Sequence, residues 1–255
     1  MEGLARGGGA SRVDVTDDWR QGRTAHGGLT AGLCTEAAVR AGADLPPLRS
    51  AHFALMGPAS GALSVIPTTL RAGRSAVFAG VDVAGDAGPA ARALLCFGAG
   101  RESALNYGAL PMPDAPPPDA CQPYFAPGRS PGFAQHFDTR LAAGARPMTP
   151  GAAPHARVWV RHRDEAARAS IAGLVALADA VPPAAFILFA APAPFSTATW
   201  ALDVLTEAPI SPDGWWLIDA RAETAAGGYS SQAMTVWSSD GTPVMACRQT
   251  VAVFA

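Results

Sequence analysis

The sequence predicts an α+β fold made of two tandem repeats. A helix-like segment, a Pro-Pro pair and four strand-like segments occur in that order twice along the chain. The turn signals inside the two sets also match in order, and a proline-rich stretch separates the sets. Self-similarity of this kind is typical of an internal duplication. The 255 residues are enough to give each repeat a hydrophobic core.

The first repeat begins with a helix predicted over 29–41, where apolar residues recur at helical spacing. The preceding pair Gly27 and Gly28 allows the start of this helix to approach another backbone closely. Gly42 and the following Pro-Pro pair end it. Alternating apolar segments separated by Gly-containing turns then predict four strands, over 49–56, 62–71, 75–84 and 91–99.

The second repeat follows the same plan. An alternating strand is predicted over 157–163, and Asp164 is placed to cap a helix over 166–178. Pro182 and Pro183 end that helix. Four further strands are predicted over 197–205, 215–223, 231–239 and 243–254.

The stretch 106–154 holds eleven of the 23 prolines and has no sustained periodicity. A stretch of this composition predicts a linker that forms no domain of its own. We therefore expect an N-terminal repeat over 1–105, a Pro-rich linker over 106–154 and a C-terminal repeat over 155–255.

Composition excludes several classes of protein. Apolar residues make up 49% and charged residues 16% of the chain, which argues against disorder. The net charge of −2 without an Arg-rich stripe argues against a nucleic-acid partner. The longest apolar run, around 184–194, is too short and too proline-rich for a membrane span. The first ten residues lack the apolar region of a signal peptide, so we expect a cytoplasmic protein.

Cysteine usage fits the same compartment. The four cysteines lie far apart, without the CxxC or His/Cys spacing of a metal site. We therefore expect reduced thiols and no bound metal. The motifs GxSxG, GxxxxGK[ST] and HExxH are also absent.

Three polar residues interrupt the apolar strands of the second repeat: Asp203, Thr224 and Gln249. An Asp within a strand of Leu, Trp and Val is costly if it is buried without a partner. One interpretation is that Asp203 faces solvent, Thr224 belongs to a turn and Gln249 lies on an edge. The other is that the three side chains hold a water, with Asp203 as the base.

The chain resembles the TesB-like acyl-CoA thioesterases, whose fold is a double hotdog: two repeats, each a long helix wrapped by an antiparallel sheet. The resemblance covers nearly the whole chain outside the Pro-rich stretch. It is carried by HGGLTAGL, RSAHFALMGPASG and LRAGRS in the first repeat, and by ALDVL, DGWWLIDARAETAAGG and SSDGTPVMACRQTVAVF in the second.

The resemblance implies catalytic roles for the same three residues. The family's Asp lies in an LDH strand that reads Leu-Asp-Val here, so Asp203 matches it and Val204 replaces the usual His. Thr224 lies eight residues after Trp216, as the family's Thr follows its Trp. Gln249 lies eight residues after the Gly of the Asp-Gly turn, as in the family. The replacement by Val204 puts acyl preference and full activity in question.

The implied reaction is hydrolysis of an acyl-CoA thioester by a water held by these three side chains. A covalent intermediate on the carboxylate is an open alternative. We expect backbone N–H groups around Gly27, Gly28 and Leu29, at the positive start of the first helix, to stabilise the oxyanion. His26 either lies beside the thioester or bonds local backbone at the helix entry.

Two other functions remain open. One is an acyl-thioester binding protein of the same fold that no longer hydrolyses its ligand. The other is a hotdog hydratase or dehydratase, in which a His five residues after the Asp is usual, whereas Ala208 stands there. The resemblance further implies a role in fatty acid metabolism, an acyl-CoA substrate, no cofactor and a homo-oligomer.

Overall fold

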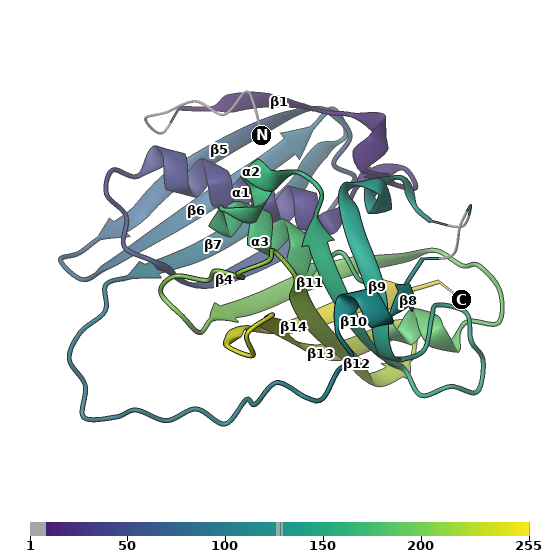
Figure 1. The fold of residues 1–255 in the computed structure, drawn as a ribbon. Helices are drawn as coiled ribbons and strands as arrows, with labels where there is room; N and C mark the ends of the chain where they lie inside the picture. Colours follow the sequence, from purple (N-terminus) through teal and green to yellow (C-terminus); the bar gives the residue numbers. More distant parts are fainter. Residues whose placement is uncertain (1–8, 126–127, 129, 255) are drawn as a thin grey trace.

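The computed structural model describes residues 9–125, 128 and 130–254, so most of the segment examined for a signal peptide lies outside the described residues. One twelve-stranded antiparallel sheet wraps around two helices, α1 (Gly27–Ala41) and α3 (Ile171–Ala178) (Figure 1). The strand order in this sheet is β1-β5-β6-β7-β4-β11-β14-β13-β12-β10-β9-β8. Each helix with its own half of the sheet is one repeat, as the expected double hotdog requires.

The first repeat confirms the predicted helix and four strands. Its strands are β4 (Leu48–Leu55), β5 (Gly61–Ala72), β6 (Ala76–Gly85) and β7 (Gly88–Gly98). A further strand, β1 (Ser11–Val15), pairs with β5 and was not predicted. Between β1 and α1 lie the short 3-10 helix η1 (Asp17–Trp19) and the hairpin of β2 (Arg20–Gln21) and β3 (Thr24–Ala25).

The second repeat repeats this arrangement. Its strands are β10 (His155–His162), β11 (Phe195–Val204), β12 (Trp216–Ala226), β13 (Tyr229–Ser238) and β14 (Pro243–Val253). The predicted helix over 166–178 is divided into α2 (Glu165–Arg168) and α3. Asp164 caps α2 through Ala166 N at 2.9 Å, as expected, and Ser170 starts α3 by accepting from Gly173 N at 2.9 Å. A second capping residue therefore explains the division.

The structure corrects the prediction of a linker over 106–154. This stretch contains η2 (Pro118–Ala120), β8 (Gln122–Pro123), η3 (Gly132–His136) and β9 (Phe137–Gly144). β9 pairs with β10 along its length, so it belongs to the sheet of the second repeat. The part before η2 has no regular elements, but it is bound to the sheet. Indole N–H groups of Trp159 and Trp237 donate to the carbonyl oxygens of Pro116 (2.8 Å) and Leu110 (2.9 Å).

Two contacts join the repeats. In the sheet, β4 pairs antiparallel with β11. Inside the sheet, α1 packs antiparallel on α3 through glycines. A Cβ on Gly28 would lie 2.4 Å from Ala176 O, and one on Gly32 would lie 2.9 Å from Ala172 O. The expectation that glycine allows a close backbone approach is therefore confirmed, and it places the start of α1 beside the end of α3.

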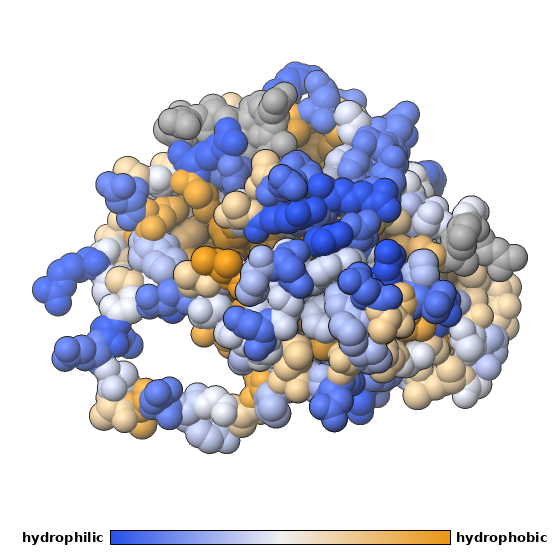
Figure 2. Space-filling model, in the orientation of Figure 1, coloured by the Kyte–Doolittle hydropathy of each residue, from blue (hydrophilic) through white to orange (hydrophobic). Residues whose placement is uncertain are grey.

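The surface and the helices have the properties expected from the composition of the chain. Hydrophilic and hydrophobic residues are interspersed on the face seen in Figure 2. None of the helices in the described part of the chain is long and apolar enough to cross a membrane. The four cysteines are free, with Cys34 and Cys247 buried.

Candidate active site

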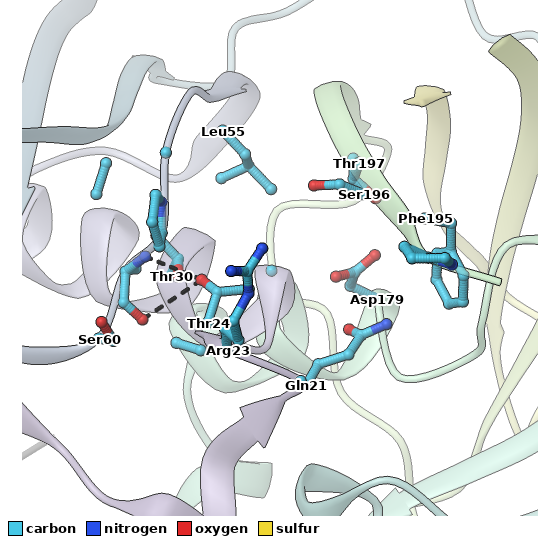
Figure 3. Close-up of a pocket in the computed structure, with 18 of the residues that line it drawn as sticks. Gln21, Arg23, Thr24, Thr30, Leu55, Ser60, Asp179, Phe195, Ser196 and Thr197 are labelled. Atoms are coloured by element: carbon cyan, nitrogen blue, oxygen red, sulfur yellow. Dashed lines mark hydrogen bonds between the residues drawn. The ribbon is translucent and has the colours of Figure 1, made fainter. Parts of the chain in front are cut away.

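A cavity of about 860 Å³ opens where the two repeats meet. The β2–β3 hairpin and the β4–β5 loop of the first repeat form one side (Figure 3). The end of α3 and the start of β11, from the second repeat, form the other. Much of its wall is apolar and includes Leu55, Met56, Pro58, Phe133, Phe195 and Phe254. A concave, mainly apolar site with a few polar groups is typical of small-molecule binding.

The carboxyl group of Asp179 is the acidic group of this cavity. Asp179 directly follows α3, and its side chain is 11% exposed. Gln249 Nε2 donates to Asp179 Oδ1 at 2.7 Å, and the backbone N–H of Gly28 at the start of α1 also acts to lower the pKa of the carboxyl group. His26 Nε2 donates to the backbone oxygen of Asp179 at 2.9 Å and lies 3.4 Å from Oδ2.

Burial changes the acidity of this pair. Loss of solvent raises the pKa of the Asp179 carboxyl group, although His26, Gln249 and Gly28 partly oppose the rise. Burial also lowers the pKa of His26, against the opposing effect of Asp179. We therefore describe His26 as a neutral imidazole with its proton on Nε2, since the backbone oxygen of Asp179 can only accept.

A chain of amides fixes the orientation of Gln249. Ala184 N donates to Gln232 Oε1 at 2.9 Å, so the Nε2 of Gln232 faces the other way. Gln232 Nε2 then donates to Gln249 Oε1 at 2.5 Å, which leaves Gln249 Nε2 to donate to Asp179. Both glutamines are 1% exposed. This series of hydrogen bonds therefore begins at the backbone N–H of Ala184 and ends at the carboxylate of Asp179.

Two hydroxyl groups line the cavity beside Asp179, those of Ser196 and Thr197 (Figure 3). The pairing of β11 with β14 shifts register between Thr197 and Thr199, which is a β-bulge at Ala198. A bulge changes the face to which the following side chains point. Thr197 pairs with the buried Val251, so the bulge places it on the inner face of the sheet.

The structure does not assemble the three residues predicted as catalytic. Gln249 lies at the site, but Asp203 is exposed on the outer face of β11, because it alternates with the buried Leu202 and Val204. Thr224 is also exposed, near the end of β12, where its hydroxyl accepts from Ser231 N at 3.3 Å. Val204, which replaces the family's His, faces the core and does not line the cavity.

The predicted oxyanion residues are divided by the structure. Gly27 lines the cavity, whereas Gly28 does not. His26 is 1% exposed and its ring stacks on that of Phe133, with the ring centroids 3.9 Å apart. It bonds the backbone oxygen of Asp179 in the other repeat instead of local backbone, and it does not line the cavity. Leu29 does not line the cavity.

A sequence signal for Asp179 existed but was overlooked. Asp179 ends a run of apolar helical residues, just before Pro182 and Pro183. Carboxylates favour the first turn of a helix, because the macrodipole is negative at the last turn. An Asp at the end of a buried helix is therefore unusual enough to indicate a function.

Among the described residues, no cluster of His, Cys, Asp or Glu side chains is arranged to hold a metal ion.

Comparison with known proteins identifies the class of protein to which the chain belongs. A model of the acyl-CoA thioesterase N-terminal domain matches residues 15–98, and a model of the C-terminal domain matches residues 113–253. No curated protein sequence matches the chain. The chain is therefore a hotdog-fold protein whose two repeats match the two halves of a thioesterase.

Solved structures share the fold over nearly the whole chain. A conserved protein of unknown function with a hot dog fold from Alicyclobacillus acidocaldarius is 25% identical, with a TM-score of 0.86, over 99% of this chain and 96% of that one. The tesB protein of Mycobacterium avium subs paratuberculosis is 18% identical (TM-score 0.79; 100% and 96% covered). The acyl-CoA thioesterase II TesB2 of Mycobacterium marinum is 22% identical (TM-score 0.74; 96% and 93% covered).

The family is shown by the match of its C-terminal model to more than half of the chain. This chain belongs to the acyl-CoA thioesterase family and is a thioester hydrolase.

Proposed function

We propose that the chain hydrolyses acyl-CoA thioesters, with Asp179 as the base that activates water. The observation that supports this is a buried carboxyl group, bonded by Gln249 and adjacent to the start of α1, that opens into a mainly apolar cavity. An Asp whose pKa is raised is a stronger base than an ordinary Asp, once it is ionised. The apolar wall suits an acyl chain, and the open side leaves room for CoA.

The reaction follows from these positions. A water near Asp179 and Thr197 attacks the thioester carbonyl carbon, and its proton passes to the Asp179 carboxylate. The negative charge on the carbonyl oxygen is stabilised by the positive start of α1 at Gly27. When the intermediate collapses, the carbon–sulfur bond breaks, the CoA thiolate leaves, and the proton that Asp179 took from the water passes to the sulfur.

A pair of variants tests this assignment. Asp179→Asn keeps the acceptor for Gln249 but removes the base, so we expect turnover to fall by about 100-fold or more. Asp203→Asn is the matched control, because Asp203 lies on the outer face of the sheet. Release of free thiol from a set of acyl-CoA chain lengths is the measurement.

The outcomes separate the two assignments. If Asp203→Asn abolished turnover and Asp179→Asn did not, the catalytic base would be the one predicted from the sequence. If neither variant changed turnover, Asp179 would have no role as a base.

A further inference from the structure

One cationic side chain, that of Arg23, lines the cavity. It stands in the two-residue turn between β2 and β3, where Gly22 has a φ of +65°. In Figure 3 its guanidinium group extends into the space between the hairpin and Asp179. Among the described lining residues, Arg23 and Asp179 are the two that carry charge.

The hairpin that carries Arg23 is fastened to the first repeat. Ala59 N donates to Thr24 Oγ1 at 2.9 Å, and Ala25 N donates to Ala59 O at 2.6 Å. These bonds lie directly after Arg23 in the chain. The backbone that presents the guanidinium group is therefore held in place beside the cavity.

Arg23 has no acidic partner within the part of the chain that the structure describes. Its neighbour Arg20, in contrast, pairs with Asp17 at 3.0 Å, and Arg49 pairs with Glu207 at 2.5 Å. A guanidinium group beside a mainly apolar cavity has no role toward a neutral acyl chain, whereas it pairs well with carboxylate or phosphate oxygens.

We propose that Arg23 binds an anionic oxygen group that is covalently part of the thioester substrate. This inference rests on the proposed function. The group is either a carboxylate on the acyl chain or a phosphate of CoA, since both offer the same oxygens to the guanidinium group. Arg23 also offsets the negative charge of Asp179, which would otherwise repel such a substrate from the cavity.

Four thioesters distinguish the two sources: hexanoyl-CoA, adipoyl-CoA, and the same two acyl groups on N-acetylcysteamine, which has no phosphate. We expect Arg23→Gln to raise KM about tenfold for thioesters that carry the recognised anion. Hexanoyl-N-acetylcysteamine, which has no charge, should be unaffected. Arg74→Gln is the matched control, because Arg74 also stands in an exposed turn but does not line the cavity.

The pattern of KM values decides the matter. An effect on both adipoyl thioesters identifies the acyl carboxylate, and an effect on both CoA thioesters identifies a phosphate. Equal KM values in wild type and Arg23→Gln for all four, or an equal rise that includes the uncharged thioester, would overturn the proposal. Calorimetric binding of the four corresponding thioethers repeats the comparison without turnover. A wild-type protein that hydrolyses none of the thioesters would thus refute the proposed function while the role of Arg23 was still measured.

Discussion

At the scale of single residues, Asp179 has to lose its proton before it acts as a base. Burial raises the pKa of its carboxyl group, so this loss occurs at higher pH than in an exposed Asp. The nearby His26 is kept neutral by its own lowered pKa and contributes no second limb at higher pH. We expect kcat/KM to fall toward acidic pH, with an inflection above the ordinary Asp value of about 3.9. A pH–rate profile on an uncharged thioester measures this, and a profile that is flat down to about pH 4 would contradict it.

The same group links stability to pH. Because its folded-state pKa is raised, the native state holds the Asp179 proton more tightly than the unfolded chain does. This contribution to stability is complete below the unfolded pKa and is lost as pH rises through the folded pKa. We therefore expect Asp179→Asn to be at least as stable as wild type at pH 7, by up to about 1 kcal/mol.

Urea unfolding of both proteins at about pH 4 and pH 7 provides the measurement. The advantage of Asp179→Asn should shrink at the lower pH, where wild type is itself protonated. A variant that is less stable than wild type by more than about 1 kcal/mol at pH 7 would show that the carboxylate is stabilising instead.

Gln232 is expected to act on the reaction through Gln249. In Gln232→Glu the side chain has only acceptors, so Gln249 must turn its Nε2 toward residue 232 and its oxygen toward Asp179. Loss of the bond from Gln249 raises the pKa of Asp179 further. We expect the acidic limb of the pH–rate profile to move to higher pH and kcat to fall about tenfold.

Gln232→Met is the companion variant, because it removes the amide without forcing Gln249 to turn. A smaller shift of the acidic limb is expected there. If both variants moved the limb equally, the order of donors and acceptors along the amide chain would not matter.

Sequence reasoning found one residue of the site and missed its partner for a definable reason. Gln249 was identified because it interrupts an apolar strand and lies eight residues after the Gly of the Asp-Gly turn, as in the family that the chain resembles. The structure places it on the inner face. Asp203 lies in a strand too, but the apolar residues Leu202 and Val204 flank it, so the period-two pattern already indicated an outward face. Asp179 carries the signal of a carboxylate after an apolar helix, but its contact with Gln249 follows only from the tertiary structure.

At the scale of elements, the contact between α1 and α3 is the most sensitive to small changes. A Cβ on Gly28 would meet Ala176 O at 2.4 Å, which is backbone and cannot turn aside. We expect Gly28→Ala to lower the free energy of unfolding by about 2 kcal/mol and to reduce turnover, because the start of α1 must move away from Asp179. Gly108→Ala, at a site with open space, is the control for urea unfolding. An unchanged midpoint for Gly28→Ala would show that the helices separate at no cost.

Regular elements were predictable where their pattern was strong. The helix α1 and the eight long strands of the two repeats follow from periodicity and turn residues. The strand β9 was missed because it lies in a Pro-rich stretch without sustained periodicity, and its place is fixed by pairing with β10. The break between α2 and α3 was missed because Ser170 was not recognised as a second cap.

At the scale of the whole molecule, the repeats share one sheet and one site. The pairing of β4 with β11 and the packing of α1 on α3 leave no surface along which the repeats separate without exposing core residues. We therefore expect a single cooperative unfolding transition. Buried Cys34 reports on the first repeat, and five of the six tryptophans lie in the second.

Two probes test this expectation during urea unfolding. Labelling of Cys34, followed by peptide mass spectrometry, should have the same midpoint as tryptophan fluorescence. Midpoints that differ would show that one repeat unfolds while the other remains folded.

The juxtaposition of the two helix ends has a consequence for how such a gene can change. The first repeat contributes the start of α1 to the proposed active site, and the second repeat contributes the end of α3. At the end of α1 the residue that corresponds to Asp179 is Gly42. A chain assembled from two copies of the first repeat would keep a sheet but have no carboxylate, and one from two copies of the second would lack the glycine start. Recombination that made the two repeats identical would therefore remove one of the two groups on which the proposed reaction depends. The need for both groups keeps the two repeats different in sequence.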